Sequence, residues 1–208
     1  MATHEPTAAE RFIQGILPEN PVYRQLLGMC PTLAVTGAME PAMTMAAATA
    51  FVLISANVMI SLIRRLLKPH LRILVFTLTI ATFVTIADRV LAAYLYQISK
   101  QLGPYVPLII VNCLIISRCE ICSSKQGTFV AICDGVGMSI GFALALGSIA
   151  TVREILGSGT WFGLPLLPVS WPGWGILVLP PGAFLMLGLL LGIAEWIGQR
   201  RNEKKQGA

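Results

Sequence analysis

Long apolar segments separated by short polar connections dominate the chain. The four longest are residues 42–63, 73–95, 128–152 and 176–197. Residues 42–63 give 22 consecutive positions without a charge, and a helix of that length crosses the roughly 30 Å of hydrocarbon in a bilayer. Pro180 and Pro181 interrupt the last segment, so its regular helix is expected to begin near Pro181. The pattern predicts four long membrane-spanning helices.

Two further apolar segments are too short to cross a bilayer as plain helices. Residues 26–38 have 13 positions and residues 105–116 have 12. Such lengths are typical of re-entrant or interfacial segments. Each segment contains one cysteine, Cys30 in the first and Cys113 in the second.

Basic residues favour the cytoplasmic side of a membrane and therefore orient the predicted helices. One basic group lies between the first two long helices and another lies in the C-terminal tail: Arg64, Arg65, Lys68 and Arg72, then Arg200, Arg201, Lys204 and Lys205. Three long helices between these groups would leave the tail outside, so one more crossing is needed. Residues 105–116 are the available candidate, as a short helix extended by non-helical backbone that protein buries.

The order of segments repeats along the chain. Residues 24–95 and residues 105–197 each read as a short cysteine segment followed by two long helices. Three crossings in each half would make the second half inverted relative to the first. We expect an all-α integral membrane protein of six transmembrane segments in two inverted three-helix repeats. A polar cytoplasmic segment, 1–23, precedes the repeats and a basic cytoplasmic tail, 198–208, follows them.

Composition supports the membrane assignment and excludes other classes. Hydrophobic residues make up 55% of the 208 positions and charged residues only 12%, against about a quarter in soluble domains. The net charge of +5 comes from basic residues in connections, without the interleaved aromatic residues of a nucleic-acid surface. The five cysteines are an odd number in apolar surroundings, which is unlike a secreted disulfide framework.

Cys30 and Cys113 hold equivalent places in the two repeats. Equivalent positions of an inverted repeat meet near the middle of the membrane, so the two thiols are expected to approach one another there. Two thiolates are half of the set of four that holds a [2Fe–2S] cluster, and a related second protein could supply the rest. A free cysteine also packs as a small hydrophobic residue. The residues themselves leave both roles open.

The other cysteines and the membrane acids have simpler interpretations. Cys119 and Cys122 form a C-x-x-C pair without a second pair or a nearby histidine, and packing is the expected role for both and for Cys133. Structural roles are expected for the acids near helix ends, Asp88 and Glu195. Asp134 is open between a structural role and an ion relay. Arg153 and Glu154 are expected to begin an outside loop.

Several stretches of the sequence resemble one family. These are NPVYRQLLGMCPTLAVT, SLIRRLLKPHLRI, VPLIIVNCLIISRCE, DGVGMSIGF, VREILGSGTWFG and LPPGAFLMLGLLL, in order over residues 20–197. They resemble the RnfE proteins of Rnf electron-transport complexes, which are relatives of the NqrD proteins of sodium-translocating NADH:quinone reductases. LPPGAF and LLGMCP look more like the Rnf branch.

The resemblance implies a fold, a cofactor and partners. It implies a six-helix subunit of a bacterial inner-membrane complex, paired with the homologous RnfA protein and assembled with RnfB, RnfC, RnfD and RnfG. It also implies a [2Fe–2S] cluster shared with RnfA, to which Cys30 and Cys113 match as ligands. The complex would transfer electrons between NADH and ferredoxin, coupled to sodium or proton movement, with flavins and further clusters in other subunits.

One stretch departs from the family pattern. The usual N-C-x-x-x-G-R-A-E-A-F is replaced by N-C-L-I-I-S-R-C-E-I-C, so Cys119 and Cys122 stand where the pattern has no thiols. This favours excluding them as ligands. Two alternatives to an electron-relay subunit stay open, namely an inverted-repeat secondary transporter and a scaffold subunit without a redox role.

Overall fold

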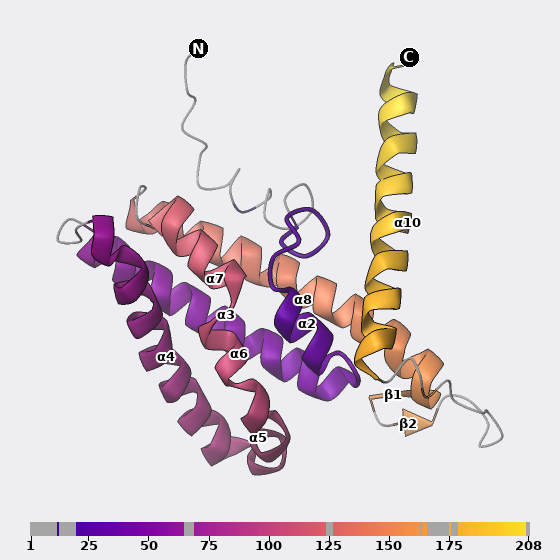
Figure 1. Ribbon diagram of the computed structural model, residues 1–208, viewed down its shortest axis with the longest axis horizontal. Coiled ribbons are helices and arrows are strands. Elements are labelled where there is room, and N and C mark those ends of the chain that lie inside the picture. The colour runs from indigo at the N-terminus through magenta and orange to yellow at the C-terminus, as the bar shows by residue number, and fades with distance from the viewer. Residues whose placement is uncertain are drawn as a thin grey trace.

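The computed structural model describes residue 12 and residues 20–64, 69–123, 127–162, 164–165, 175 and 179–206. This part of the chain is almost entirely helical (Figure 1). Its elements are α2 (Met29–Val35), α3 (Met39–Ile63), η1 (Pro69–Leu71), α4 (Arg72–Tyr94), α5 (Tyr96–Leu102), η2 (Gly103–Tyr105), α6 (Pro107–Ile110), α7 (Cys113–Arg118), η3 (Cys119–Ser123), α8 (Thr128–Ser158), β1 (Thr160–Trp161), β2 (Leu164–Pro165) and α10 (Pro180–Gln206). The strands β1 and β2 pair antiparallel.

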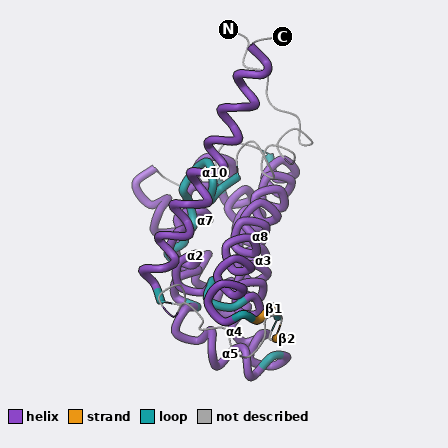
Figure 2. Tube along the Cα trace, turned by 90° about the vertical axis from the view of Figure 1, so that its right-hand side faces the viewer, coloured by secondary structure: helices purple, strands orange, loops and turns teal. Residues whose placement is uncertain are grey.

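The long helices α3 and α8 pack side by side through the centre of the molecule (Figures 1 and 2). Side chains of α3 pack directly on the backbone of α8 at Gly135, where an added Cβ would lie 2.9 Å from Nδ2 of Asn57. That amide group donates a hydrogen bond across the pair to the backbone oxygen of Ala131, at 3.2 Å. Small residues and interhelical hydrogen bonds of this kind stabilise helix pairs in membranes, where the hydrophobic effect between helices is weak.

The helix α4 covers one side of α3 and leaves most of its own surface exposed. It buries Phe76, Ile80 and Val84 against the core of the molecule. On its other face Ile73 is 67% exposed and Leu78 is 65% exposed. An apolar surface of this extent is suited to lipid or to other subunits.

Three of the four predicted long helices are confirmed as long enough and apolar enough to cross a membrane. They are α3, α4 and α8. The fourth, α10, begins at Pro180, one residue before the predicted start, but its apolar part is the shorter stretch Pro180–Trp196. Figure 1 shows that α10 leaves the bundle at a steep angle to α3 and α8.

The second short segment is part of a sharply bent helix pair, a geometry shared by broken spans and re-entrant loops. Tyr96–Tyr105 and Pro107–Cys122 are together apolar enough and long enough to cross, and they meet at a bend of 57°. The prediction was one short helix over residues 105–116 extended by non-helical backbone. The structure instead has helical turns on both sides and places the non-helical backbone inside the segment, at Val111 and Asn112. Leu95, at φ −132° and ψ 60°, ends α4, and Pro107 stands in the first turn of α6, where a missing N–H costs little.

Arg153 and Glu154 lie inside α8 rather than at the start of a loop, so that prediction was also wrong. Both side chains are buried. Arg153 donates to Oγ1 of Thr36 at 2.6 Å and to the backbone oxygen of Leu179 at 3.4 Å. Glu154 accepts from the backbone N–H of Met39 at 2.7 Å. These bonds hold the ends of α2, α3, α8 and α10 together, which explains why charged residues continue the helix.

The two ends of the chain differ in how much of them the structure describes. Most of the predicted segment 1–23 lies outside the described residues, whereas the backbone of the predicted tail 198–208 continues α10 as far as Gln206. The inverted relation of the two repeats and the count of six crossings stay predictions.

Candidate functional site

Both short cysteine segments are present as short helices that begin close to their cysteine. Cys30 is the second residue of α2, and Cys113 is the first residue of α7. Asn112 has extended backbone and caps α7, since its Oδ1 accepts from the N–H of Leu114 at 3.0 Å. An asparagine cap of this type satisfies an N–H at the start of a helix that otherwise has no partner. The break before α7 therefore fixes where Cys113 stands.

A hydrogen bond joins the two segments directly. The backbone N–H of Gly28 donates to Sγ of Cys113 at 2.9 Å. Gly28 is the N-cap residue immediately before α2, with φ 76° and ψ 24°, and it lies two positions before Cys30. Since two residues of chain span at most about 7 Å, the structure brings the Cys113 thiol close to the cysteine of the first segment.

Exposure separates these two cysteines from the other three. The side chains of Cys30 and Cys113 are exposed, those of Cys119 and Cys122 are buried, and Cys133 is intermediate. Packing within the chain therefore explains Cys119 and Cys122, as predicted. It explains Cys30 and Cys113 poorly, because neither side chain is enclosed by its own chain.

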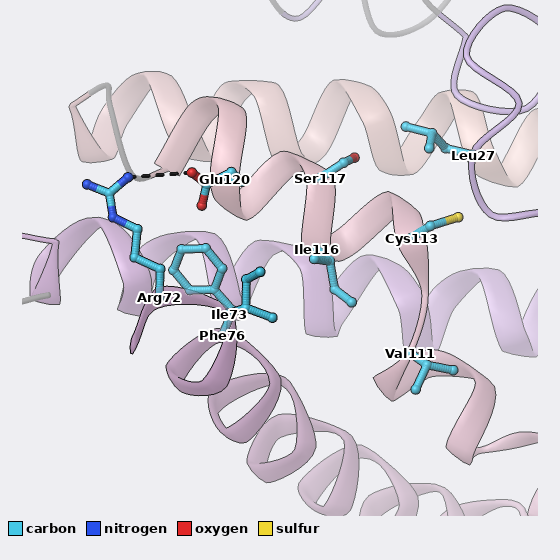
Figure 3. Close-up of a pocket in the computed structure, with 9 residues that line it drawn as sticks. All are labelled: Leu27, Arg72, Ile73, Phe76, Val111, Cys113, Ile116, Ser117 and Glu120. Atoms are coloured by element: carbon cyan, nitrogen blue, oxygen red, sulfur yellow. Dashed lines mark hydrogen bonds and ion pairs between the residues drawn. The ribbon is translucent and has the colours of Figure 1, made fainter. Parts of the chain in front are cut away.

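A cavity of about 590 Å³ lies beside Cys113, between α4 and the bent helix pair that contains α6 and α7. Figure 3 shows Cys113 and Leu27 toward one end of it, and Arg72 and Glu120 toward the other. Arg72 and Glu120 form an ion pair at 3.5 Å. The wall between the two ends is mostly apolar, so this side of Cys113 is a hydrophobic environment.

A buried ion pair anchors the other end of α7. Nη2 of Arg118 lies 3.1 Å from Oδ1 of Asp134 on α8, and the two side chains are 4% and 1% exposed. The sequence pattern identified Asp134 but missed its partner, although Arg118 is only 16 residues away. The pairing favours the structural role for Asp134. Glu195 also has a structural partner, Arg24, at 3.3 Å, but that pair is exposed.

The thiols of Cys30 and Cys113 can contribute two soft ligands to a metal. Among the described residues, no three or more histidine, cysteine, aspartate or glutamate side chains are grouped closely enough to hold a metal ion. Any metal held by Cys30 and Cys113 therefore needs further ligands from outside this part of the chain. The exposure of both thiols leaves room for a second protein to supply them.

Comparison with known proteins identifies the family. Residues 8–191 match the family described as "Rnf-Nqr subunit, membrane protein". The chain belongs to the Rnf-Nqr family. The resemblance inferred from the sequence is therefore confirmed at the level of the family, and the many apolar helices agree with a membrane subunit of this kind.

Several Rnf-Nqr relatives match over nearly their full length. The E subunit of the Na(+)-translocating ferredoxin:NAD(+) oxidoreductase complex of Acetobacterium woodii is 44% identical, with 90% of this chain and 95% of that protein covered. The D subunit of the Na(+)-translocating NADH-quinone reductase of Aeromonas salmonicida is also 44% identical, with 92% and 91% covered. The E subunit of the ion-translocating oxidoreductase complex of Methanosarcina acetivorans is 40% identical, with 93% and 92% covered. Identity alone does not separate the two branches.

Proposed function

We propose that the chain is the electron-relay subunit of an Rnf-type ion-translocating oxidoreductase complex. In this proposal Cys30 and Cys113 hold one half of a [2Fe–2S] cluster, and the homologous RnfA protein holds the other half. The observation that carries it is the hydrogen bond from the backbone N–H of Gly28, two positions before Cys30, to Sγ of Cys113. It places two segments that each carry an exposed cysteine side by side. The names of the relatives support membership of a complex that couples electron transfer to ion transport.

The residues present fit such a cluster. Iron–sulfur clusters of this type take four cysteine thiolates, and this chain offers two thiols on an exposed surface. The hydrogen bond from a backbone N–H to Sγ is the kind of contact that stabilises a cluster ligand. A complete site in one chain would need more ligands than the described residues bring together.

Each residue of the site has a definite task in this proposal. When bound, the cluster would take up and release single electrons. Cys30 and Cys113 bind it, Asn112 fixes the start of α7, and Gly28 orients the Cys113 sulfur. Mostly apolar side chains line the cavity beside Cys113 and give this side of the site a low polarity. The chain makes or breaks no bond of a substrate, so it is part of an enzyme without an active site of its own.

The proposal includes the topology and the location. The subunit would cross the bacterial inner membrane six times with both termini in the cytoplasm, as two inverted repeats. Its partners would be RnfA, RnfB, RnfC, RnfD and RnfG, and other subunits of the complex would carry the flavins and further clusters. Electrons would pass between NADH and ferredoxin, coupled to the movement of sodium or protons.

The polar groups of the broken segments favour this proposal over a secondary transporter. Such a transporter needs free polar ligands beside its helix breaks. Here the hydroxyl of Thr32 donates to the backbone oxygen of Gly28 at 2.7 Å, and that of Thr36 donates to the backbone oxygen of Thr32 at 2.5 Å. Oδ1 of Asn112 caps α7, whereas its Nδ2 is buried without a hydrogen-bond partner among the described residues. One free donor falls short of the set of ligands that a substrate site needs.

The deciding experiment removes the thiols one at a time. We expect Cys30→Ser and Cys113→Ser to abolish the electron paramagnetic resonance (EPR) signal and visible absorption of one [2Fe–2S] cluster in the purified complex. Cys133→Ser is the matched control and should keep both the EPR signal and the visible absorption, because Cys133 lies on α8, outside the two short cysteine segments. Assembly is followed by the amount of this chain that copurifies with RnfA. A full cluster signal in either of the first two variants would exclude the proposed ligands.

A further inference from the structure

Gly28 is held in an unusual conformation by its surroundings. Its φ of 76° lies in the left-handed region, which only glycine adopts without strain. Its backbone oxygen accepts from the hydroxyl of Thr32 at 2.7 Å while its N–H donates to Cys113. Both backbone groups of the residue are therefore engaged, one with its own helix and one with the thiol of the other segment.

The space around Gly28 is also too small for a side chain. A Cβ added there would lie 2.7 Å from Cε2 of Phe142 and 3.4 Å from its Cδ2. Phe142 is fully buried and packs in a cluster with Leu114, Leu146 and Leu187. Because that cluster fixes the ring, a side chain at position 28 must displace the backbone of Gly28, and the N–H moves with it.

The corresponding N–H of the other segment has a different partner. Val111 stands two positions before Cys113, as Gly28 stands two positions before Cys30. The N–H of Val111 donates to the backbone oxygen of Pro107, at 3.5 Å. Of these two equivalent backbone N–H groups, that of Gly28 donates to a cysteine sulfur and that of Val111 donates to a backbone oxygen. The surroundings of the two thiols therefore differ.

We propose that Gly28 is a positioning residue that raises the reduction potential of the cluster by holding its N–H against Sγ of Cys113. Reduction adds negative charge to the cluster and its sulfur ligands. An N–H dipole aimed at one of those sulfurs stabilises the reduced state more than the oxidised state, and hydrogen bonds to sulfur are among the factors that set such potentials. This inference rests on the proposed function, because it requires Cys113 to be a ligand.

Isotope labelling tests the hydrogen bond itself. The complex is prepared with ¹⁵N-glycine, and pulsed EPR is recorded on the signal that Cys113→Ser removes. We expect one ¹⁵N coupling in the wild type that disappears in the double variant Gly28→Ala with Phe142→Leu, because the alanine nitrogen carries no label. Leucine lacks the Cε2 and Cζ atoms of phenylalanine, so the double variant has room for the new Cβ. Gly37→Ala, labelled in the same way, is the matched control and should keep the coupling, since an added Cβ at Gly37 meets nothing within 4 Å.

A redox titration tests the effect on potential. We expect the potential of Gly28→Ala to be lower than that of the wild type, with the double variant between them and with Phe142→Leu and Gly37→Ala close to wild type. If Gly28→Ala does not assemble, the reduction potential of the double variant is compared with that of Phe142→Leu. We expect the potential of the double variant to be the lower of the two.

The outcomes separate this inference from the proposed function. A wild-type spectrum without the ¹⁵N coupling, or a coupling that survives in the double variant, overturns the role of Gly28 while the cluster ligands stand. An unchanged potential in the deciding variant does the same. If no cluster signal depends on Cys113, the proposed function fails and the role of Gly28 fails with it.

Discussion

At the scale of single residues, the chain uses its buried charges to join helices. Arg118 and Asp134 join α7 to α8, and Arg153 and Glu154 join α8 to the ends of three other helices. A charge buried without a partner costs several kcal/mol, whereas a paired and hydrogen-bonded charge is tolerated. The Arg118–Asp134 pair and the hydrogen bonds of Arg153 and Glu154 therefore fix which helix ends meet, including the end of the helix that begins with Cys113.

The Arg118–Asp134 pair provides a test at this scale. We expect Asp134→Asn to destabilise the protein by about 3–5 kcal/mol, because it leaves the charge of Arg118 buried without its carboxylate. Thermal unfolding of the subunit in detergent measures the effect.

A matched control for this test comes from the exposed pair. Glu195→Gln removes the carboxylate beside Arg24, where the two side chains are 57% and 52% exposed, and exposed pairs contribute less than about 1 kcal/mol. Equal losses of unfolding free energy in Asp134→Asn and Glu195→Gln would show that burying the Arg118–Asp134 pair does not increase the cost of breaking it.

At the scale of elements, the break between α6 and α7 is the feature that places Cys113. The chain leaves the helical conformation at Val111 and Asn112 and starts again at Cys113. Asn112 caps this restart, so its side chain helps to fix the first turn of α7, in which Cys113 stands.

The cap can be weakened without removing the thiol. We expect Asn112→Ala to lower stability by about 1 kcal/mol, the usual cost of losing a helix cap, and to reduce the iron content of the purified complex. Asn112→Ser keeps an oxygen at the capping position and should retain more iron than Asn112→Ala. Iron and protein assays on the same samples give the ratio, and equal ratios in both variants would rule out a role for the cap.

At the scale of the whole molecule, the sequence predicted the long helices better than the contacts between them. Runs of apolar residues long enough to span a bilayer predicted α3, α4 and α8, because the bilayer imposes that length. The same rule placed the end of α8 too early, since charged residues normally end a span and the partners of Arg153 and Glu154 are far away in the chain. The left-handed conformation of Gly28 and its bond to Cys113 could not be predicted, because neither leaves a local pattern.

The six-crossing topology gives a prediction for the C-terminal tail. We expect a fluorescent protein fused after Ala208 to fluoresce in the cytoplasm and alkaline phosphatase fused at the same place to be inactive. Six crossings return the tail to the side of the basic residues, whereas a re-entrant second short segment would leave it outside. High phosphatase activity at this position, after normalising for expression, would contradict the six-crossing topology.

The bond between Gly28 and Cys113 also sets an order of events during biosynthesis. The two residues are 85 positions apart, and α3, α4 and α5 lie between them. At about 5–20 residues per second, a ribosome needs roughly 4–17 s to make that length of chain. During this time Cys30 has been made and Cys113 has not. Any cofactor that both thiols hold can therefore be bound only after more than half of the 208 residues have been made.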